Sequence, residues 1–276
     1  MIQPKISVVT VCYNAAETIE QTMQSVINQT YENIEYIIID GGSTDGTVEI
    51  IKKYADKIAY WVSEPDKGIY DAMNKGIKVA TGEWIGFLNS GDFYLDSNVL
   101  SSLIYKSLSY KHPDVIYGYT VYSFKYGKFV GRKLPLSKFR KTMPFGHPST
   151  FVRTELMKES LFDCSYKIAA DYNFLYNLYT SNKQFCFVDV IVTDFESETG
   201  VSNKSLFLTM KETAIINGSY GSIGYMIHYC KVAVNDFIKM TLEQICPKVI
   251  SKIQKREREH NNDFIPLKEF LLSRKS

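Results

Sequence analysis

The first hundred residues alternate between two patterns, and this alternation constrains the fold more than any other feature. Short runs of β-branched and other apolar residues occupy 6–11, 34–39, 58–62 and 84–88. Between them, apolar residues recur at helical spacing in 19–27, 48–54 and 69–79. Short continuous apolar runs are typical of strands buried on both faces, and strands that alternate with helices form right-handed βαβ crossovers. The sequence therefore predicts an α/β fold, with a Rossmann-like, mostly parallel sheet flanked by helices.

Polar residues follow each predicted strand. They are Thr10, Tyr13 and Asn14 after the first, Asp40 after the second, Glu64, Asp66 and Lys67 after the third, and Asn89 and Asp92 after the fourth. Because the carboxyl ends of parallel strands lie at one edge of a sheet, these side chains are expected to converge on a ligand. The set suits a nucleotide, with Tyr13 stacking, Asp40 accepting from a base or ribose, and a metal at Asp92 bridging phosphates. The simpler alternatives are that Asp40 forms a turn and that Asp92 caps a helix.

Composition and short motifs exclude several classes of function. The 32 basic and 30 acidic residues give a formal net charge of +2, too balanced for a general nucleic-acid partner. The five cysteines lack the spacing of a zinc site or a disulfide framework, which fits a reducing compartment. A signal-peptide pattern and an 18-residue uncharged apolar stretch are both missing, so a cytoplasmic location is expected. Neither GxGxxG nor GxxxxGKS/T occurs, which argues against dinucleotide-binding and P-loop phosphate sites.

The second half of the chain contributes two further candidates. Residues 114–124 and 129–134 predict a strand, a turn and a strand. The loop that follows has two prolines and a glycine around His147, and it either directs the imidazole into a pocket or is only structural. Asp171 lies in the first turn of a predicted helix, where an acid either stabilises the helix dipole or acts as a base. The polar segment 194–203 can be an ordinary linker to the C-terminal helices.

Four segments, in this order, resemble the motifs of family 2 glycosyltransferases with the GT-A fold. They are VVTVCYN at 8–14, IIDGGSTDGT at 38–47, SEPDKGIYDAMNKG at 63–76 and ATGEW at 80–84. The resemblance extends from about residue 5 to about residue 200. It implies transfer of a sugar from a nucleotide donor, most often a UDP-sugar in this family, to a hydroxyl group with inversion at the anomeric carbon.

The resemblance also implies roles for individual residues. The nucleotide pocket is expected to contain Thr10, Tyr13, Asn14, Asp40, Asp66, Lys67, Asn74 and Asn89. Asp92 is expected to hold Mn²⁺ or Mg²⁺, Asp171 to be the general base, and His147 to lie on the acceptor or phosphate side. The segment 194–203 is expected to form a mobile loop over the donor phosphates.

The chain departs from the family's pattern at three positions. The fourth strand ends in Asn89-Ser90-Gly91-Asp92, where most relatives have an Asp-x-Asp-Asp turn, so Asp92 is the turn's only carboxylate. Ala170 replaces the Glu that usually precedes the base, so the orientation of the base must come from elsewhere. Met73 stands where many relatives have Arg, and Lys67 can supply that charge.

The chain is expected to divide near residue 203. The predicted parts are a GT-A domain over 1–203, with a nucleotide-binding half at about 1–95 and an acceptor half at about 96–203, and a C-terminal helical extension over 204–276. Helices are expected at 206–216 and 225–258, the second ending in the basic run KVISKIQKRER. An apolar and basic helix of this kind packs on a core or on a partner subunit of a homo-oligomer, or docks on the inner membrane face.

The predicted function is sugar transfer to a glycan or lipid-linked acceptor in the synthesis of a surface polysaccharide, such as O-antigen, capsule or exopolysaccharide. Two other classes stay open. A catalytically impaired nucleotide-sugar-binding module would explain the reduced turn at 89–92 and Ala170. A nucleotidyltransferase on a related sheet would need a glycine-rich, basic loop after the first strand, and 12–17 does not provide one.

Overall fold

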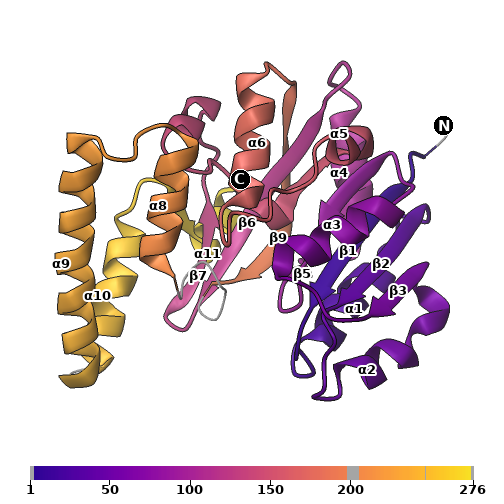
Figure 1. The fold of residues 1–276 in the computed structure, drawn as a ribbon, viewed down its shortest axis with the longest axis horizontal. Helices are drawn as coiled ribbons and strands as arrows, with labels where there is room; N and C mark the ends of the chain where they lie inside the picture. The colour runs from indigo at the N-terminus through magenta and orange to yellow at the C-terminus, as the bar shows by residue number, and fades with distance from the viewer. Residues whose placement is uncertain (1–2, 198–204, 246, 275–276) are drawn as a thin grey trace.

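The structure is a computed structural model that describes residues 3–197, 205–245 and 247–274 (Figure 1). The elements of the first 95 residues are β1 (Ile6–Cys12), α1 (Ile19–Ile27), β2 (Ile34–Asp40), α2 (Thr47–Lys53), the 3₁₀ helix η1 (Ala55–Lys57), β3 (Tyr60–Ser63), α3 (Ile69–Val79), β4 (Trp84–Phe87) and β5 (Phe93–Tyr94). The predicted alternation of strands and helices is confirmed, with boundaries that differ by at most two residues.

The strands of this half form a parallel sheet. β1 pairs in parallel with both β2 and β4, and β2 pairs in parallel with β3. The full path of the sheet is β10-β7-β6-β8-β4-β1-β2-β3, and β9 pairs with β6 and β5. The carboxyl ends of β1 to β4 therefore lie at one edge, as the sequence predicts.

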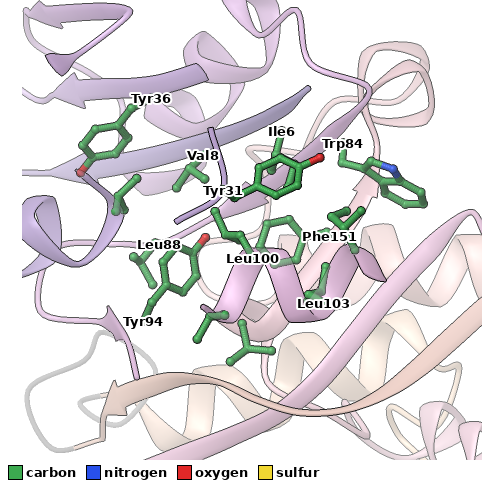
Figure 2. Packing of buried hydrophobic residues seen from close by; sticks show 14 of the residues in the cluster. Ile6, Val8, Tyr31, Tyr36, Trp84, Leu88, Tyr94, Leu100, Leu103 and Phe151 are labelled. Carbon is green, nitrogen blue, oxygen red and sulfur yellow. The ribbon is translucent and has the colours of Figure 1, made fainter. Parts of the chain in front are cut away.

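Two hydrophobic layers cover the faces of the sheet, and the side chains of β1 alternate between them. Val8 packs in one cluster together with residues of α1 and α4. Figure 2 labels side chains of this cluster, among them Leu100 and Leu103 of α4. Val9 and Val11 pack in the other cluster with residues of α3 and α6. This alternation is the period of two that a strand covered on both faces requires. The mostly apolar stretch of β1, which only Ser7 and Thr10 interrupt, has this origin.

The second half extends the same sheet with mostly antiparallel strands. Its elements are α4 (Val99–Ser107), β6 (Val115–Phe124), β7 (Gly127–Gly131), the 3₁₀ helices η2 (Leu136–Arg140) and η3 (His147–Ser149), β8 (Thr150–Arg153), α5 (Thr154–Glu159), α6 (Ala170–Thr180) and β9 (Phe185–Glu196). β8 is antiparallel to both β4 and β6, so β6 runs in the direction of β4. β9 pairs in parallel with β6, and its carboxyl end reaches the same edge as the end of β4.

The C-terminal part differs from the prediction. Its elements are α8 (Leu206–Ile216), α9 (Ile223–Ile245), α10 (Pro247–Glu259), β10 (Phe264–Pro266) and α11 (Leu267–Ser273). The single helix predicted for 225–258 was wrong, because α9 and α10 are separate helices that lie side by side (Figure 1) and are joined by an ion pair of 2.8 Å between Lys239 Nζ and Glu257 Oε2. Proline cannot continue a helix but is well suited to begin one, so Pro247 starts α10 instead of extending α9.

The chain's last described elements are built into the sheet. β10 pairs antiparallel with β7, and the buried Phe270 of α11 packs on Val121 and Val130. β10 and α11 therefore belong to the main body of the molecule. In the described ranges, the helices are all too short or too polar to cross a membrane.

Candidate active site

Residues from both halves of the sheet meet at the carboxyl edge of the parallel strands. Because β8 is antiparallel to β4, the loop before β8 reaches the end of β4, where His147 stacks on Phe87 with ring centroids 5.5 Å apart. Helix α6 begins at Ala170, and its first-turn residue Asp171 lies beside His147, with 3.8 Å between Oδ2 and Nδ1. The predicted acceptor-side residues His147 and Asp171 therefore lie at the same sheet edge as the residues predicted to bind the nucleotide.

Asp40 ends β2 and is fully buried. One carboxylate oxygen accepts hydrogen bonds from the amides of Gly42 and Ser43 and from the Ser63 hydroxyl, and the other accepts from the Ser43 hydroxyl and the Cys12 thiol. Burial raises the pKa of Asp40, but the hydrogen bonds outweigh burial and leave the pKa below its usual value. Both oxygens are already engaged within the turn, which favours the turn-forming interpretation of Asp40.

The side chains of Tyr13 and Asp66 both approach Gly41 closely at the rim. A Cβ atom on Gly41 would stand 2.5 Å from Asp66 Oδ2 and 3.4 Å from a ring carbon of Tyr13. Tyr13 is 65% exposed, so one face of its ring is open to a ligand. Only glycine leaves room for this close approach of the two side chains, and the result is a ring and a carboxylate on one small surface.

Asn14 and Lys67 also lie at this rim. Asn14 has a φ of 47°, and its Oδ1 atom accepts a hydrogen bond of 3.0 Å from the amide of Thr44. Asn14 therefore ties the loop after β1 to the loop after β2. Lys67 is exposed in the loop before α3, beside Asp66. A cationic side chain at this place can face an anionic ligand such as a diphosphate.

Two residues predicted for the nucleotide pocket point elsewhere. Thr10 is fully buried within β1, and its hydroxyl pairs with the Tyr36 hydroxyl at 3.0 Å. Asn74 exchanges two hydrogen bonds of 2.9 Å with the main chain of Phe162. The Asn74 side chain therefore fastens α3 to the segment before α6, and neither side chain is oriented toward the rim. Met73, at the position where relatives often have Arg, is buried in the core.

The turn after β4 is held from α1. The hydroxyl of Thr22 accepts a hydrogen bond of 3.0 Å from the Gly91 amide and donates one of 2.7 Å to the Asp92 carbonyl. Gly91 has a φ of 100°, which favours glycine, so its presence has a conformational reason. In the part of the chain that the structure describes, Asn89 Oδ1 is a buried oxygen without a hydrogen-bond partner. An orphaned buried acceptor in a tight turn is suited to a ligand hydroxyl or a cation.

Asp92 is a buried carboxylate in an unfavourable electrostatic environment. Its side chain accepts one hydrogen bond, 3.2 Å long, from the Glu196 amide at the end of β9. Burial, together with the nearby carboxylates of Glu196 and Asp194, raises the pKa of Asp92 well above its usual value. Lys128 pairs with Asp194 and neutralises part of that charge. A bound cation would favour the ionised form of Asp92.

The turn fits a divalent metal only in part. The carboxylate of Asp92 and the amide oxygen of Asn89 are hard ligands of the kind that Mg²⁺ and Mn²⁺ accept. Among the described residues, however, His, Cys, Asp and Glu side chains do not form a group of three or more that could hold a metal ion. The protein can therefore supply one or two ligands, and a metal here would need the phosphates of a substrate to complete its coordination.

Asp171 has two neighbours that the sequence did not connect to it. The hydroxyl of Tyr70, from α3, donates a hydrogen bond of 3.0 Å to Asp171 Oδ1. His147 faces the other carboxylate oxygen, and the two side chains are only 13% and 21% exposed. Burial lowers the pKa of His147, although the charge of Asp171 acts in the opposite direction. A neutral imidazole is therefore expected next to an acid that remains accessible to a ligand.

The predicted loop at 194–203 is partly strand. β9 continues to Glu196, and Ser197 is the last residue described before the gap. Residues 198–203 of the predicted loop lie outside the described residues. The described part contributes Asp194 and Glu196 to the surroundings of Asp92. The only sign of this role in the sequence is the acidic character of the segment.

Comparison with known proteins identifies the family. The model of glycosyl transferase family 2 matches residues 7–169, more than half of the chain. The chain belongs to this family and is a glycosyltransferase. An uncharacterized glycosyltransferase of Mycobacterium tuberculosis is 34% identical over 186 residues, which cover 62% of this chain and 68% of the relative. A PGL/p-HBAD biosynthesis glycosyltransferase of Mycobacterium bovis is 25% identical over 211 residues, covering 74% and 81%.

Solved structures share the fold. The TarS 1–349 structure of S. aureus in complex with UDP-GlcNAc has a TM-score of 0.60 at 22% identity, covering 77% of this chain and 66% of that chain. The chain spans 39% of the longer TarS structure. The mannosyltransferase PcManGT of Pyrobaculum calidifontis, in complex with GDP-Man and Mn²⁺, has a TM-score of 0.57 at 15% identity, covering 94% and 89%. These likenesses support the GT-A fold predicted from the sequence.

Proposed function

We propose that the protein transfers a sugar from a nucleoside diphosphate sugar of the UDP-GlcNAc type to an acceptor hydroxyl, with inversion. The observation that carries the proposal is Asp171, a partly exposed carboxylate held by Tyr70 at the same sheet edge as the Asn89–Asp92 turn. One carboxylate for the acceptor and one turn for the leaving group are what a single displacement requires. The TarS structure with UDP-GlcNAc supports this type of donor.

The donor side is assigned to the rim formed by the loops after β1, β2 and β3. The open face of Tyr13 can stack on a base, and Asp66 can accept hydrogen bonds from it. Asn89 Oδ1 lacks a partner within the described structure and can accept from a ribose hydroxyl. Lys67 supplies positive charge for the phosphates. Asp40 and Asn14 contribute by holding the loops that carry these groups.

The acceptor step is assigned to Asp171. Its carboxylate takes the proton of the acceptor hydroxyl while the oxygen attacks the anomeric carbon and the bond from that carbon to the diphosphate breaks. The attack occurs on the face opposite the nucleotide, so the anomeric configuration inverts. The hydrogen bond from Tyr70 fixes one carboxylate oxygen and leaves the other, which faces His147, for the proton.

A divalent metal, Mn²⁺ or Mg²⁺, would be held by Asp92, with Asn89 beside it in the same turn. When bound, the metal supplies positive charge that stabilises the departing diphosphate. The Mn²⁺ of PcManGT supports this assignment. The raised pKa of Asp92 shows that its ionised form is disfavoured by burial and by nearby carboxylates, and a bound cation would stabilise that form. Because the chain offers few ligands, metal binding should depend on the nucleotide.

A donor screen by thermal shift tests the proposal. UDP-GlcNAc and UDP should raise Tm, and Mn²⁺ should increase the effect although it has little effect alone. Release of UDP from UDP-GlcNAc then separates the three classes. Stabilisation with UDP release supports a transferase, and stabilisation without release supports an impaired binding module. Stabilisation by nucleoside triphosphates, with pyrophosphate release, would instead favour a nucleotidyltransferase.

We further propose that the acceptor is a glycan on a lipid carrier, as in assembly of a surface polysaccharide, and that α9 faces the inner membrane surface. The helix carries a stripe of apolar side chains that are 48% to 81% exposed: Ile223, Met226, Ile227, Val234, Phe237, Ile238 and Ile245. The neighbouring α10 adds exposed Lys252, Lys255 and Arg256. Apolar and basic surfaces together favour anionic lipid.

Membrane docking predicts a specific sensitivity to charge on the stripe. Phe237→Asp should weaken binding to vesicles of phosphatidylglycerol and phosphatidylcholine by roughly tenfold or more, because a buried Phe contributes about 1.5–3 kcal/mol. Asn235→Asp is the matched control, since it adds the same charge to an exposed site on roughly the opposite side of α9. Co-sedimentation with vesicles measures both. Equal binding by the Phe237→Asp variant and the unmodified protein would refute docking through α9.

A further inference from the structure

Glu212 is a buried carboxylate that reaches from α8 to the segment immediately before α6. It is 6% exposed. One of its oxygens accepts a hydrogen bond of 2.8 Å from the amide of Lys167, and the other accepts bonds of 3.0 and 2.9 Å from the amides of Ile168 and Ala169. Three consecutive main-chain donors on a single carboxylate make a rigid connection, because each bond to an ionised acceptor is stronger than a neutral one.

This connection lies two residues before Asp171. The same segment is held from its other side by Tyr70, whose hydroxyl contacts both the Ile168 carbonyl and Asp171 Oδ1. Glu212 therefore fixes the amides of the segment, while the single hydroxyl proton of Tyr70 is shared between the Ile168 carbonyl and the Asp171 carboxylate. The position and direction of the first turn of α6, and so of the Asp171 side chain, follow from these two supports.

Ala170 cannot orient Asp171, so another residue has to do so. The residue directly before the base has no polar group with which to orient its neighbour, and Ala170 is fully buried. Within the described residues, Glu212 is the acid that contacts the main chain of 167–169. We propose that Glu212 is a positioning residue for Asp171, and that α8 therefore belongs to the catalytic machinery. This inference rests on the proposed function of Asp171.

The test uses Glu212→Gln in the full chain. Glutamine keeps the size of the side chain, but its NH₂ group faces main-chain donors and cannot accept from them. UDP release from UDP-GlcNAc should fall by roughly 10²-fold in kcat, as for a reacting group displaced by about 1 Å, while KM for UDP-GlcNAc stays unchanged. Glu49→Gln, an exposed acid on the remote helix α2, is the control and should behave as the unmodified protein.

A double substitution separates positioning from loss of stability. If Glu212 acts through the base, Glu212→Gln should cause no further loss of kcat in an Asp171→Asn background. Additive losses would overturn the proposal, and so would full kcat in the folded single variant.

Hydrogen exchange gives an answer that does not depend on the donor. The amides of Lys167, Ile168 and Ala169 should exchange faster in the Glu212→Gln variant than in the unmodified protein, and unchanged protection would refute the contact. If the unmodified protein releases no UDP from UDP-GlcNAc, the proposed function fails, whereas the exchange result still decides whether Glu212 holds this segment.

Discussion

Replacement of Asp171 by Asn should lower kcat for UDP release from UDP-GlcNAc by roughly 10²- to 10⁴-fold, the usual contribution of a general base. Asparagine has the same shape and still accepts the hydrogen bond from Tyr70, which is 3.0 Å long in the structure. It cannot take up the proton of the acceptor hydroxyl. The change is therefore expected to affect the chemical step without disturbing the fold of the site.

The affinity for UDP is the second measurement in this experiment. Asp171 belongs to the acceptor side, so calorimetry should give the same Kd for UDP in the Asp171→Asn variant and the unmodified protein. Asp56→Asn is the control, because Asp56 is exposed and lies outside the site. Full kcat in the Asp171→Asn variant would show that Asp171 is not the general base. Loss of UDP binding would show instead that Asp171 contacts the donor.

The sequence predicts the edge of the sheet well because that prediction rests on local patterns. The apolar runs locate the strands, and the polar residues that end them, such as Tyr13, Asp66 and Asp92, lie at the rim in the structure. Thr10 shows the limit of this reasoning. Side chains alternate between the two faces of β1, and the partner of Thr10 depends on how β1 pairs with β2. This pairing brings the Thr10 hydroxyl to the Tyr36 hydroxyl.

The parts of the site that the sequence did not predict are contacts between distant segments. Asn74 looks like a motif residue, but its amide is bound to Phe162, 88 residues later. Tyr70 reaches Asp171 across 101 residues, and Glu212 reaches Ala169 across 43. Local periodicity contains no information about such pairs. Ala170 was the one available signal, because it showed that some other group must orient the base.

Asp92 is expected to control both the stabilisation by Mn²⁺ and the dependence of stability on pH. In the unmodified protein, Mn²⁺ with UDP should raise Tm strongly. At a ligand concentration of roughly 100 times Kd the gain is about 2.7 kcal/mol, and for a chain of this size this amounts to roughly 5–10 °C. Asp92→Asn should lose the part of this shift that depends on Mn²⁺, because the turn has no other carboxylate. Asp96→Asn, an exposed acid in the same region, should keep it.

The same substitution has the opposite effect without metal. The pKa of folded Asp92 lies well above its usual value, while in the unfolded chain it is about 3.9. Between these two values the folded state binds more protons than the unfolded state, so the free energy of unfolding falls as pH rises. Asparagine keeps an acceptor for the Glu196 amide and removes this titration. The metal-free variant should therefore match the unmodified protein in acid and exceed its Tm increasingly as pH rises from about 3.9 toward the pKa of folded Asp92. Thermal melts across this range in EDTA measure the difference, and a Tm for Asp92→Asn below that of the unmodified protein at neutral pH would show that the buried carboxylate is already neutralised by a charge within the protein.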